Sequence, residues 1–154
     1  MVAIIAYLGM LVGFVGIFFG FYYLADNPSV SMKIVTLSTV GIVGILGFIR
    51  HVIFHKSDAK RLGWETERPD WMFEVGFANL AFGIIGILSV IGNQSSNTQA
   101  VVVLGYAIYL LQAGVLHGFR YFTDPIKSSA KFWRNCVATL LYAGIMTFFA
   151  IQSL

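Results

Sequence analysis

Five long apolar runs dominate the sequence and constrain what the chain can fold into. They cover approximately residues 2–24, 33–55, 71–92, 99–121 and 131–153. A helix needs about 20 mainly apolar residues to cross the hydrocarbon core of a bilayer, and each run reaches that length. The runs are continuous, whereas the strands of a membrane β-barrel alternate apolar and polar residues. The sequence therefore predicts an all-α, polytopic membrane protein: one helical-bundle domain, residues 1–154, with five transmembrane helices.

The composition supports a lipid environment. Apolar residues make up 58% of the 154 residues and charged residues only 11%, whereas a soluble domain carries roughly 25% charged residues. The net charge of +3 is too small to indicate nucleic-acid binding, so the lipid bilayer is the partner that we expect. The first run lacks the basic start of a signal peptide, so we expect it to remain as a span. The single cysteine, Cys136, is expected to be a small packing residue.

Basic residues gather on one side of the predicted bundle. With five spans, the N-terminus shares that side with the second and fourth connections, and the other side holds only Lys33. The nine basic residues of the richer side are Arg50, Lys56, Lys60, Arg61, Arg68, Arg120, Lys127, Lys131 and Arg134. Because cytoplasmic loops carry an excess of Lys and Arg, we expect a multi-pass protein of the cell membrane with its N-terminus in the cytoplasm and its C-terminus outside.

Small residues form stripes along three of the predicted spans. These are Gly9, Gly13, Gly16 and Gly20 in the first, Gly41, Gly44 and Gly47 in the second, and Gly114 and Gly118 in the fourth. Helices in lipid associate through close packing, which small residues permit. We therefore predict that the stripes face neighbouring helices of the same chain. A homo-oligomer that forms through one of them is the less favoured alternative.

Polar residues cluster at one depth of the predicted bundle. His51 and His55 are four residues apart, which places them on one face of a helix. Glu74 lies about one turn inside the third span, and His117 lies near the end of the fourth. All the histidines of the chain thus fall at the same end. The candidate ligand-binding residues are Arg50, His51, His55, Glu74, Asn79, His117 and Tyr121.

Two interpretations of this cluster are open. In the first, His51, His55, Glu74 and His117 form a mixed nitrogen and oxygen shell for a transition metal such as zinc, iron or copper. A haem held by two histidines, or a substrate pocket in which Glu74 or a histidine moves a proton, is a variant. In the second, slightly favoured, the residues are structural: the histidines complement negative helix ends and Glu74 complements a positive one. Asn79 would then form hydrogen bonds between helices.

The sequence leaves several functions open. The sequence contains no glycine-rich phosphate loop, nucleophile elbow or paired-cysteine motif, so whether the protein is an enzyme stays open. The first hypothesis is a membrane protein with a ligand, metal or redox-cofactor pocket at the cytoplasmic ends of the second, third and fourth spans. The alternative is a non-enzymatic accessory subunit of a larger membrane complex. A small-molecule carrier ranks last, because no internal repeat or broken helix marks one.

Three motifs between residues 47 and 89 also suggest a family. They are Gly47-Phe48-Ile49-Arg50-His51, then Gly63-Trp64, then Phe73-Glu74-Val75-Gly76. The pattern resembles small DoxX-like integral membrane proteins and a related uncharacterised prokaryotic membrane family. The resemblance implies a compact helical bundle with Glu74 and His51 in a polar pocket. Some DoxX-like proteins are linked to quinone-dependent sulfur oxidation, but they typically have four helices, one fewer than expected here.

Overall fold

The chain folds into a helical bundle. The computed structural model describes residues 1–65, 67–124 and 127–154, which are 87% helical and include no strand. Five of the helices in this described part are long and apolar enough to cross a membrane, and they cover Val2–Leu24, Pro28–Ile53, Asp70–Ile91, Ser96–Thr123 and Ser129–Ser153. The all-α fold with five spanning helices is therefore confirmed.

Two of the spans are not continuous α-helices. The first, third and fourth spans are α1 (Val2–Leu24), α5 (Asp70–Ile91) and α6 (Ser96–Thr123). The second is composed of α2 (Pro28–Val35), the π-helical segment η1 (Thr36–Ile42), α3 (Val43–Phe48) and a second π-helical segment, η2 (Ile49–Ile53). The fifth is composed of α7 (Ser129–Phe132), η3 (Trp133–Val137), again π-helical, and α8 (Ala138–Ser153). A short helix, α4 (His55–Leu62), connects the second span to the third.

Local capping explains where several helices begin and end. The second span begins at Pro28, five residues earlier than expected, because the Asn27 side chain accepts a hydrogen bond from the Val30 N–H and proline suits the first helical position. Ser95 caps α6 in the same way by accepting from the Thr98 N–H. α4 ends at Gly63, whose φ of 78° lies in the left-handed region that glycine adopts without strain.

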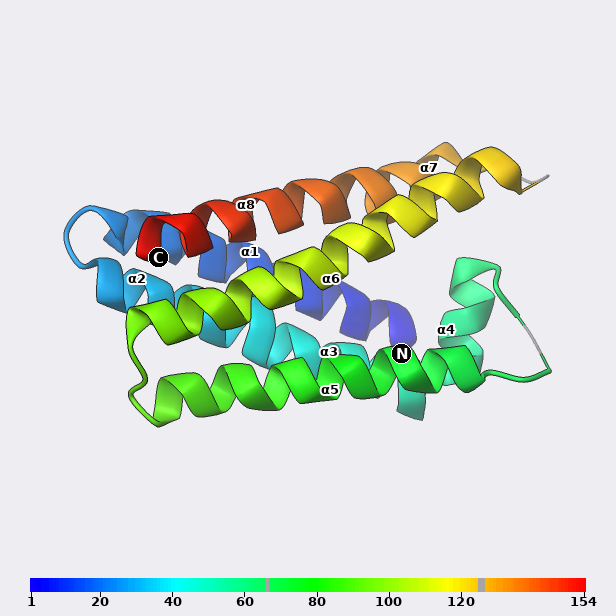
Figure 1. The fold of residues 1–154 in the computed structure, drawn as a ribbon. Coiled ribbons are helices and arrows are strands. Elements are labelled where there is room, and N and C mark those ends of the chain that lie inside the picture. Colours follow the sequence, from blue (N-terminus) through cyan, green and yellow to red (C-terminus); the bar gives the residue numbers. More distant parts are fainter. Residues whose placement is uncertain (66, 125–126) are drawn as a thin grey trace.

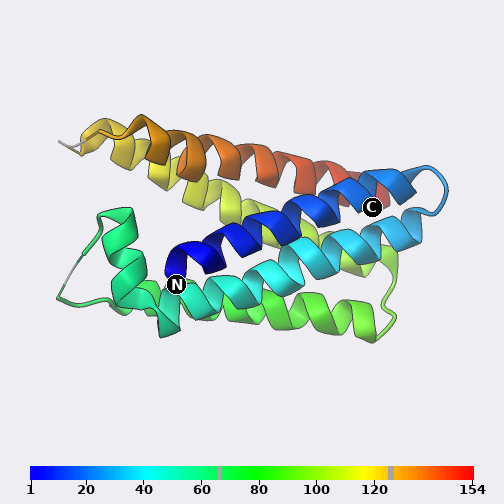
Figure 2. The same cartoon turned by 180° about the vertical axis from the view of Figure 1, so that it is seen from behind.

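The connections alternate between the two ends of the bundle. The turn between α1 and α2 and the turn between α5 and α6 lie at one end, together with the C-terminus, whereas α4 lies at the opposite end with the start of α7 (Figures 1 and 2). We call the end that holds α4 and the start of α7 the charged end, because most of the basic residues of the connections lie there. Toward it, the pair formed by α6 and α8 diverges from α5 (Figures 1 and 2).

The glycine stripes face neighbouring helices, as expected. A Cβ added to Gly16 would collide with the Ser38 side chain in η1. In the second span, a Cβ on Gly44 would lie 2.7 Å from the Asn79 carbonyl oxygen and 2.8 Å from Gly83 Cα. In the fourth, one on Gly118 would lie 3.1 Å from Cys136 Sγ. Close backbone approach thus holds the helices together, as is usual in lipid.

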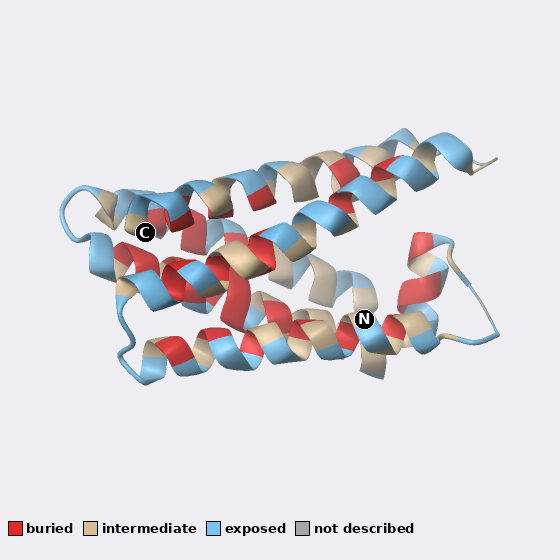
Figure 3. Cartoon of the chain, viewed as in Figure 1, coloured by how far each residue is buried: buried red, intermediate tan, exposed pale blue. Residues whose placement is uncertain are grey.

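The buried core lies mainly in the half of the bundle away from the charged end. Its largest members are Tyr106, Phe149, Met32 and Met146, from α6, α8 and α2. The outer faces of the long helices are exposed along most of their length (Figure 3). They carry large apolar side chains such as Ile91 and Phe119, with exposed fractions of 71% and 61%. An apolar exterior of this kind suits a lipid environment.

Candidate functional site

The carboxylate of Asp58 on α4 is fully buried, because its side chain has no exposed surface. Its Oδ1 accepts a hydrogen bond from Arg61 Nε at 2.7 Å. Its Oδ2 lies 3.0 Å from His51 Nδ1 and 3.2 Å from Arg50 Nε, both on η2. We call these four residues the Asp58 cluster. A carboxylate can be buried in this way only when charged and hydrogen-bonding groups surround it, and the cluster thereby fixes α4 against the end of the second span.

The contacts of His51 define where its proton lies. Arg50 Nη2 is 3.0 Å from His51 Nε2. Because a guanidinium group only donates hydrogen bonds, Nε2 must accept, and the ring proton is then on Nδ1, facing Asp58 Oδ2. His51 is therefore neutral in this arrangement, and the cluster contains two positive charges and one negative charge.

Asp58 lies outside the membrane-spanning segments and is held ionised. Burial alone would raise the pKa of its carboxyl group, but the polar contact with His51 at 3.0 Å and the charges of Arg50 and Arg61 outweigh burial and lower this pKa to about 2. The carboxylate is therefore a permanent counter-ion at physiological pH.

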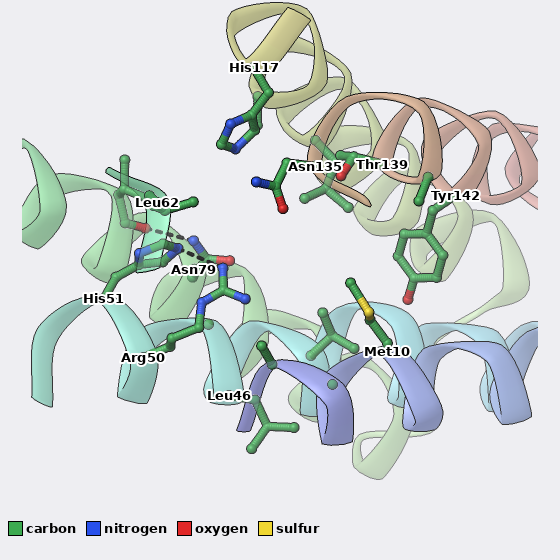
Figure 4. Close-up of a pocket in the computed structure, with 18 of the residues that line it drawn as sticks. Met10, Leu46, Arg50, His51, Leu62, Asn79, His117, Asn135, Thr139 and Tyr142 are labelled. Atoms are coloured by element: carbon green, nitrogen blue, oxygen red, sulfur yellow. Dashed lines mark hydrogen bonds between the residues drawn. The ribbon is translucent and has the colours of Figure 1, made fainter. Parts of the chain in front are cut away.

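A cavity of about 410 Å³ lies beside the Asp58 cluster, and residues from all five spans and from α4 line it. Its polar end is lined by Arg50, His51, Arg61, His117, Arg134 and Asn135. Its wall is mainly apolar and includes Met10, Leu46, Leu110 and Ala138. Figure 4 shows Arg50 and His51 reaching into this space from one side, and His117, Asn135 and Thr139 from the other. The volume lies within the roughly 300–1,000 Å³ range of small-molecule sites.

An aromatic group closes part of the polar end. The His117 ring stacks on Trp64, with 4.8 Å between the ring centroids, and Trp64 in turn contacts Trp71 at 5.6 Å. These three residues come from α6, from the segment that follows α4, and from the start of α5. The contact keeps the α4 region against both α5 and α6.

A hydrogen-bonded group joins α5 to α6 along another wall of the cavity. Tyr106 Oη donates to Asn79 Oδ1 at 2.6 Å. The Asn79 amide donates to Tyr109 Oη at 2.9 Å and to the Val75 carbonyl at 2.7 Å. Asn79 thus makes the interhelical hydrogen bonds that the second interpretation expects, and it also lines the cavity. Across the cavity, the Tyr142 hydroxyl on α8 is buried without a hydrogen-bond partner among the described residues.

The structure separates two histidines that the sequence pattern places together. His55 begins α4, where its Nδ1 hydrogen-bonds the Val52 carbonyl at 2.9 Å and its ring meets Phe73 edge-on. It does not line the cavity that His51 and His117 share. The four-residue rule holds only within a continuous α-helix. Here the chain passes through the π-helical η2 and then Phe54, whose φ of −107° and ψ of 27° break the helix.

Two further candidates also lie elsewhere. Glu74 is exposed on α5 and does not line the cavity. Tyr121 packs against Phe132, with 4.5 Å between the ring centroids. Within residues 1–65, 67–124 and 127–154, no three His, Cys, Asp or Glu side chains converge in a way that would hold a metal ion. The metal shell expected from His51, His55, Glu74 and His117 is therefore not assembled. The haem variant stays a prediction.

Five residues of the Asp58 cluster and of the polar end of the cavity were not among the residues predicted from the sequence. They are Asp58, Arg61, Trp64, Arg134 and Asn135. A signal for the first two was present: Asp58 and Arg61 are three residues apart, as in a helical ion pair, and Gly63 follows as a helix C-cap. This pattern predicts a short helix where only a charged connection was expected.

Comparison with known proteins places the chain in a family. A family model described as "Family of unknown function (DUF6790)" matches residues 1–153. No curated protein and no solved structure matches the chain. The match agrees with the expected likeness to an uncharacterised family, whereas the DoxX-like resemblance stays a prediction.

Proposed function

The chain belongs to this family of unknown function, and we propose that it is an integral membrane protein that binds a small amphipathic molecule at the charged end of its bundle. The observation that carries the proposal is the 410 Å³ cavity. Its wall is mainly apolar, and its polar end is lined by arginine and histidine side chains. Small-molecule sites characteristically combine a mainly apolar lining with a few convergent polar groups.

The backbone at the polar end supports the same proposal. Arg50 and His51 come from η2, and Arg134 and Asn135 come from η3. Both segments are π-helical, and π-helical turns inside α-helices occur frequently at functional sites. Each wider turn changes the direction in which the following side chains project, so it can present two consecutive polar residues to one space.

The distribution of charge supports an orientation for the site. We place the charged end in the cytoplasm, because that end carries most of the basic residues of the connections and cytoplasmic loops are rich in Lys and Arg. The cavity would then receive its ligand from the cytoplasm or from the inner leaflet.

Tryptophan fluorescence provides a direct test. Trp64 and Trp71 line the cavity, whereas Trp133 is exposed, so the Trp133→Phe protein in lipid nanodiscs retains only the two cavity reporters. Titration with brominated single-chain amphiphiles should quench these reporters saturably, because bromine quenches tryptophan on contact.

Two matched variants make this test specific. Ala138 lines the cavity and Ala81 is exposed on α5. In the Trp133→Phe background, Ala138→Phe should remove the saturable quenching by filling the cavity, and Ala81→Phe should leave it unchanged. Equal, unsaturable quenching in both variants would contradict the proposal.

The accessory-subunit hypothesis stays a prediction, as does assembly with a second copy of the chain. A native pull-down in mild detergent tests both, because a stoichiometric partner would be retained with the protein.

A further inference from the structure

We infer that the molecule bound in this cavity is a single-chain amphiphile with an anionic head group, a carboxylate or a phosphate, and that Arg50 and Arg134 hold the head. This inference rests on the proposed function and names the class of its ligand. Three features of the site support it: the balance of charge, the unused hydrogen-bond donors, and the size and polarity of the wall.

The balance of charge at the polar end is positive. Arg50, Arg61 and Arg134 all line the cavity, and no Asp or Glu lines it within the described part of the chain. Asp58 stands behind the lining and compensates for one positive charge. His51 contributes none, because its ring is neutral when Nε2 accepts a hydrogen bond from Arg50. Charges in a partly buried site interact strongly, so the excess of positive charge favours an anion and disfavours a cation.

The arginine side chains retain donors that could reach a ligand. Arg50 donates from Nη2 to His51 Nε2. Its Nε lies 3.2 Å from Asp58 Oδ2 without forming a hydrogen bond, and its Nη1 has no acceptor among the described residues. Arg134 donates from Nε to Asn135 Oδ1 at 3.2 Å, and neither of its amino groups has an acceptor within the same part of the chain. The planar guanidinium group matches the oxygen pairs of carboxylate and phosphate. Two arginines from different spans therefore provide a site for one such head.

The wall of the cavity suits an alkyl chain. Met10 on α1, Leu110 on α6 and Ala138 on α8 are among the apolar residues that line it. The volume of about 410 Å³ is in the lower part of the range for small-molecule sites, which favours one chain over the two chains of a phospholipid. Burial of this chain adds a contribution that grows with each methylene removed from water.

The head group can be tested by changing it while the chain is kept constant. The probes are a brominated fatty acid, the alkyl phosphate, the neutral alcohol and the alkyl trimethylammonium salt of the same brominated chain. In the Trp133→Phe protein, the two anions should quench saturably at concentrations roughly tenfold lower than the alcohol, since a hydrogen bond to a charged group contributes on this scale. The cation should bind more weakly than the alcohol.

Arg134 is the position for the matching variant. It lies outside the Asp58 cluster, so its replacement leaves no buried carboxylate unpaired. Arg134→Gln should weaken binding of the fatty acid to the level of the alcohol and leave binding of the alcohol unchanged. Lys60→Gln is the control, because Lys60 is exposed beside Arg61 and does not line the cavity. It removes the same charge and should leave the affinities for both probes unchanged.

A competition experiment distinguishes an amphiphile with an anionic head from a free anion such as phosphate. Excess inorganic phosphate should not displace the brominated fatty acid if the alkyl chain is needed for binding. Displacement by phosphate alone would overturn the assignment of an amphiphile in favour of a free anion. Equal affinity for acid and alcohol, with saturable binding of both, would overturn the anionic head while leaving the proposed function intact. Saturable binding of none of the probes would reject both.

Discussion

His51 Nδ1 lies 3.0 Å from Oδ2 of Asp58, and this contact joins the end of the second span to α4, a helix outside the five candidate spans. The two residues belong to η2 and α4, and seven positions separate them along the chain. Together with Arg50 and Arg61, they account for the position of α4 beside the cavity. Removal of the shared carboxylate should therefore affect more than one contact.

Asp58→Asn should destabilise the protein strongly. The substitution leaves Arg50 and Arg61 partly buried without their counter-ion, and loss of one partner from a buried ion pair costs about 3–5 kcal/mol. The free energy of unfolding, measured by denaturant titration in detergent micelles, should fall by this amount. Asp124→Asn is the control, because its pair with Arg120 is exposed and contributes less than about 1 kcal/mol. Equal effects of the two substitutions would contradict the importance of the Asp58 cluster.

The same carboxylate predicts a pH dependence. The folded protein lowers the pKa of Asp58 from 3.8 to about 2, so its stabilising contribution is complete above the unfolded value and is lost as the pH falls through the folded value. As the pH is lowered from about 4 to about 2, the midpoint temperature of thermal unfolding should therefore fall more steeply in the wild-type protein than in Asp58→Asn. Because other carboxylates titrate in both proteins, the difference between the two curves is the relevant measurement. Parallel curves would show that Asp58 has an unperturbed pKa.

Gly44→Ala should loosen the contact between the second and third spans. The added Cβ would lie 2.7 Å from the Asn79 carbonyl oxygen and 2.8 Å from Gly83 Cα, which are backbone atoms that cannot rotate away. Overpacking of this kind costs about 1–3 kcal/mol. Gly144→Ala is the matched control, because nothing lies within 4 Å of the added Cβ. The control should be neutral or stabilising by up to about 1 kcal/mol, since alanine favours helices.

Tyr106→Phe should weaken the link between α5 and α6. It removes the donor to Asn79 Oδ1 in a buried site, and hydrogen bonds between membrane helices contribute about 0.6–1.7 kcal/mol. Tyr7→Phe, at a position with 61% exposure, should leave the unfolding free energy unchanged. A cost for Tyr106→Phe no larger than that of the control would argue that the Asn79 group is dispensable.

The proposed orientation of the bundle predicts a labelling pattern. In a Cys136→Ala background, Asp26→Cys and Lys60→Cys place single thiols at exposed positions at opposite ends of the bundle. Since basic connections stay in the cytoplasm, a membrane-impermeant maleimide should label Asp26→Cys in intact cells and Lys60→Cys only after lysis. The reverse pattern would place the charged end outside the cell.

The sequence predicted at which depth of the bundle the candidate site lies, but it did not predict which residues line the site. The common depth of His51 and His117 follows from their positions within the spans, and both line the cavity. Depth does not define direction around a helix axis, however. His55 shares that depth and faces Phe73 instead, because the backbone leaves the α-helical conformation between it and His51.

The sequence alone determined the five spans and the packing of the glycine stripes. Both follow from local and one-dimensional constraints: the length of an apolar run against the thickness of a bilayer, and the regular spacing of small residues along a helix. Only the tertiary structure decided that Asp58 folds back onto His51, and that Arg134 from the last span shares a cavity with Arg50 from the second. Those relationships depend on a break at Phe54 and on π-helical turns, which arise where packing of the whole bundle outweighs the local preference for a regular helix.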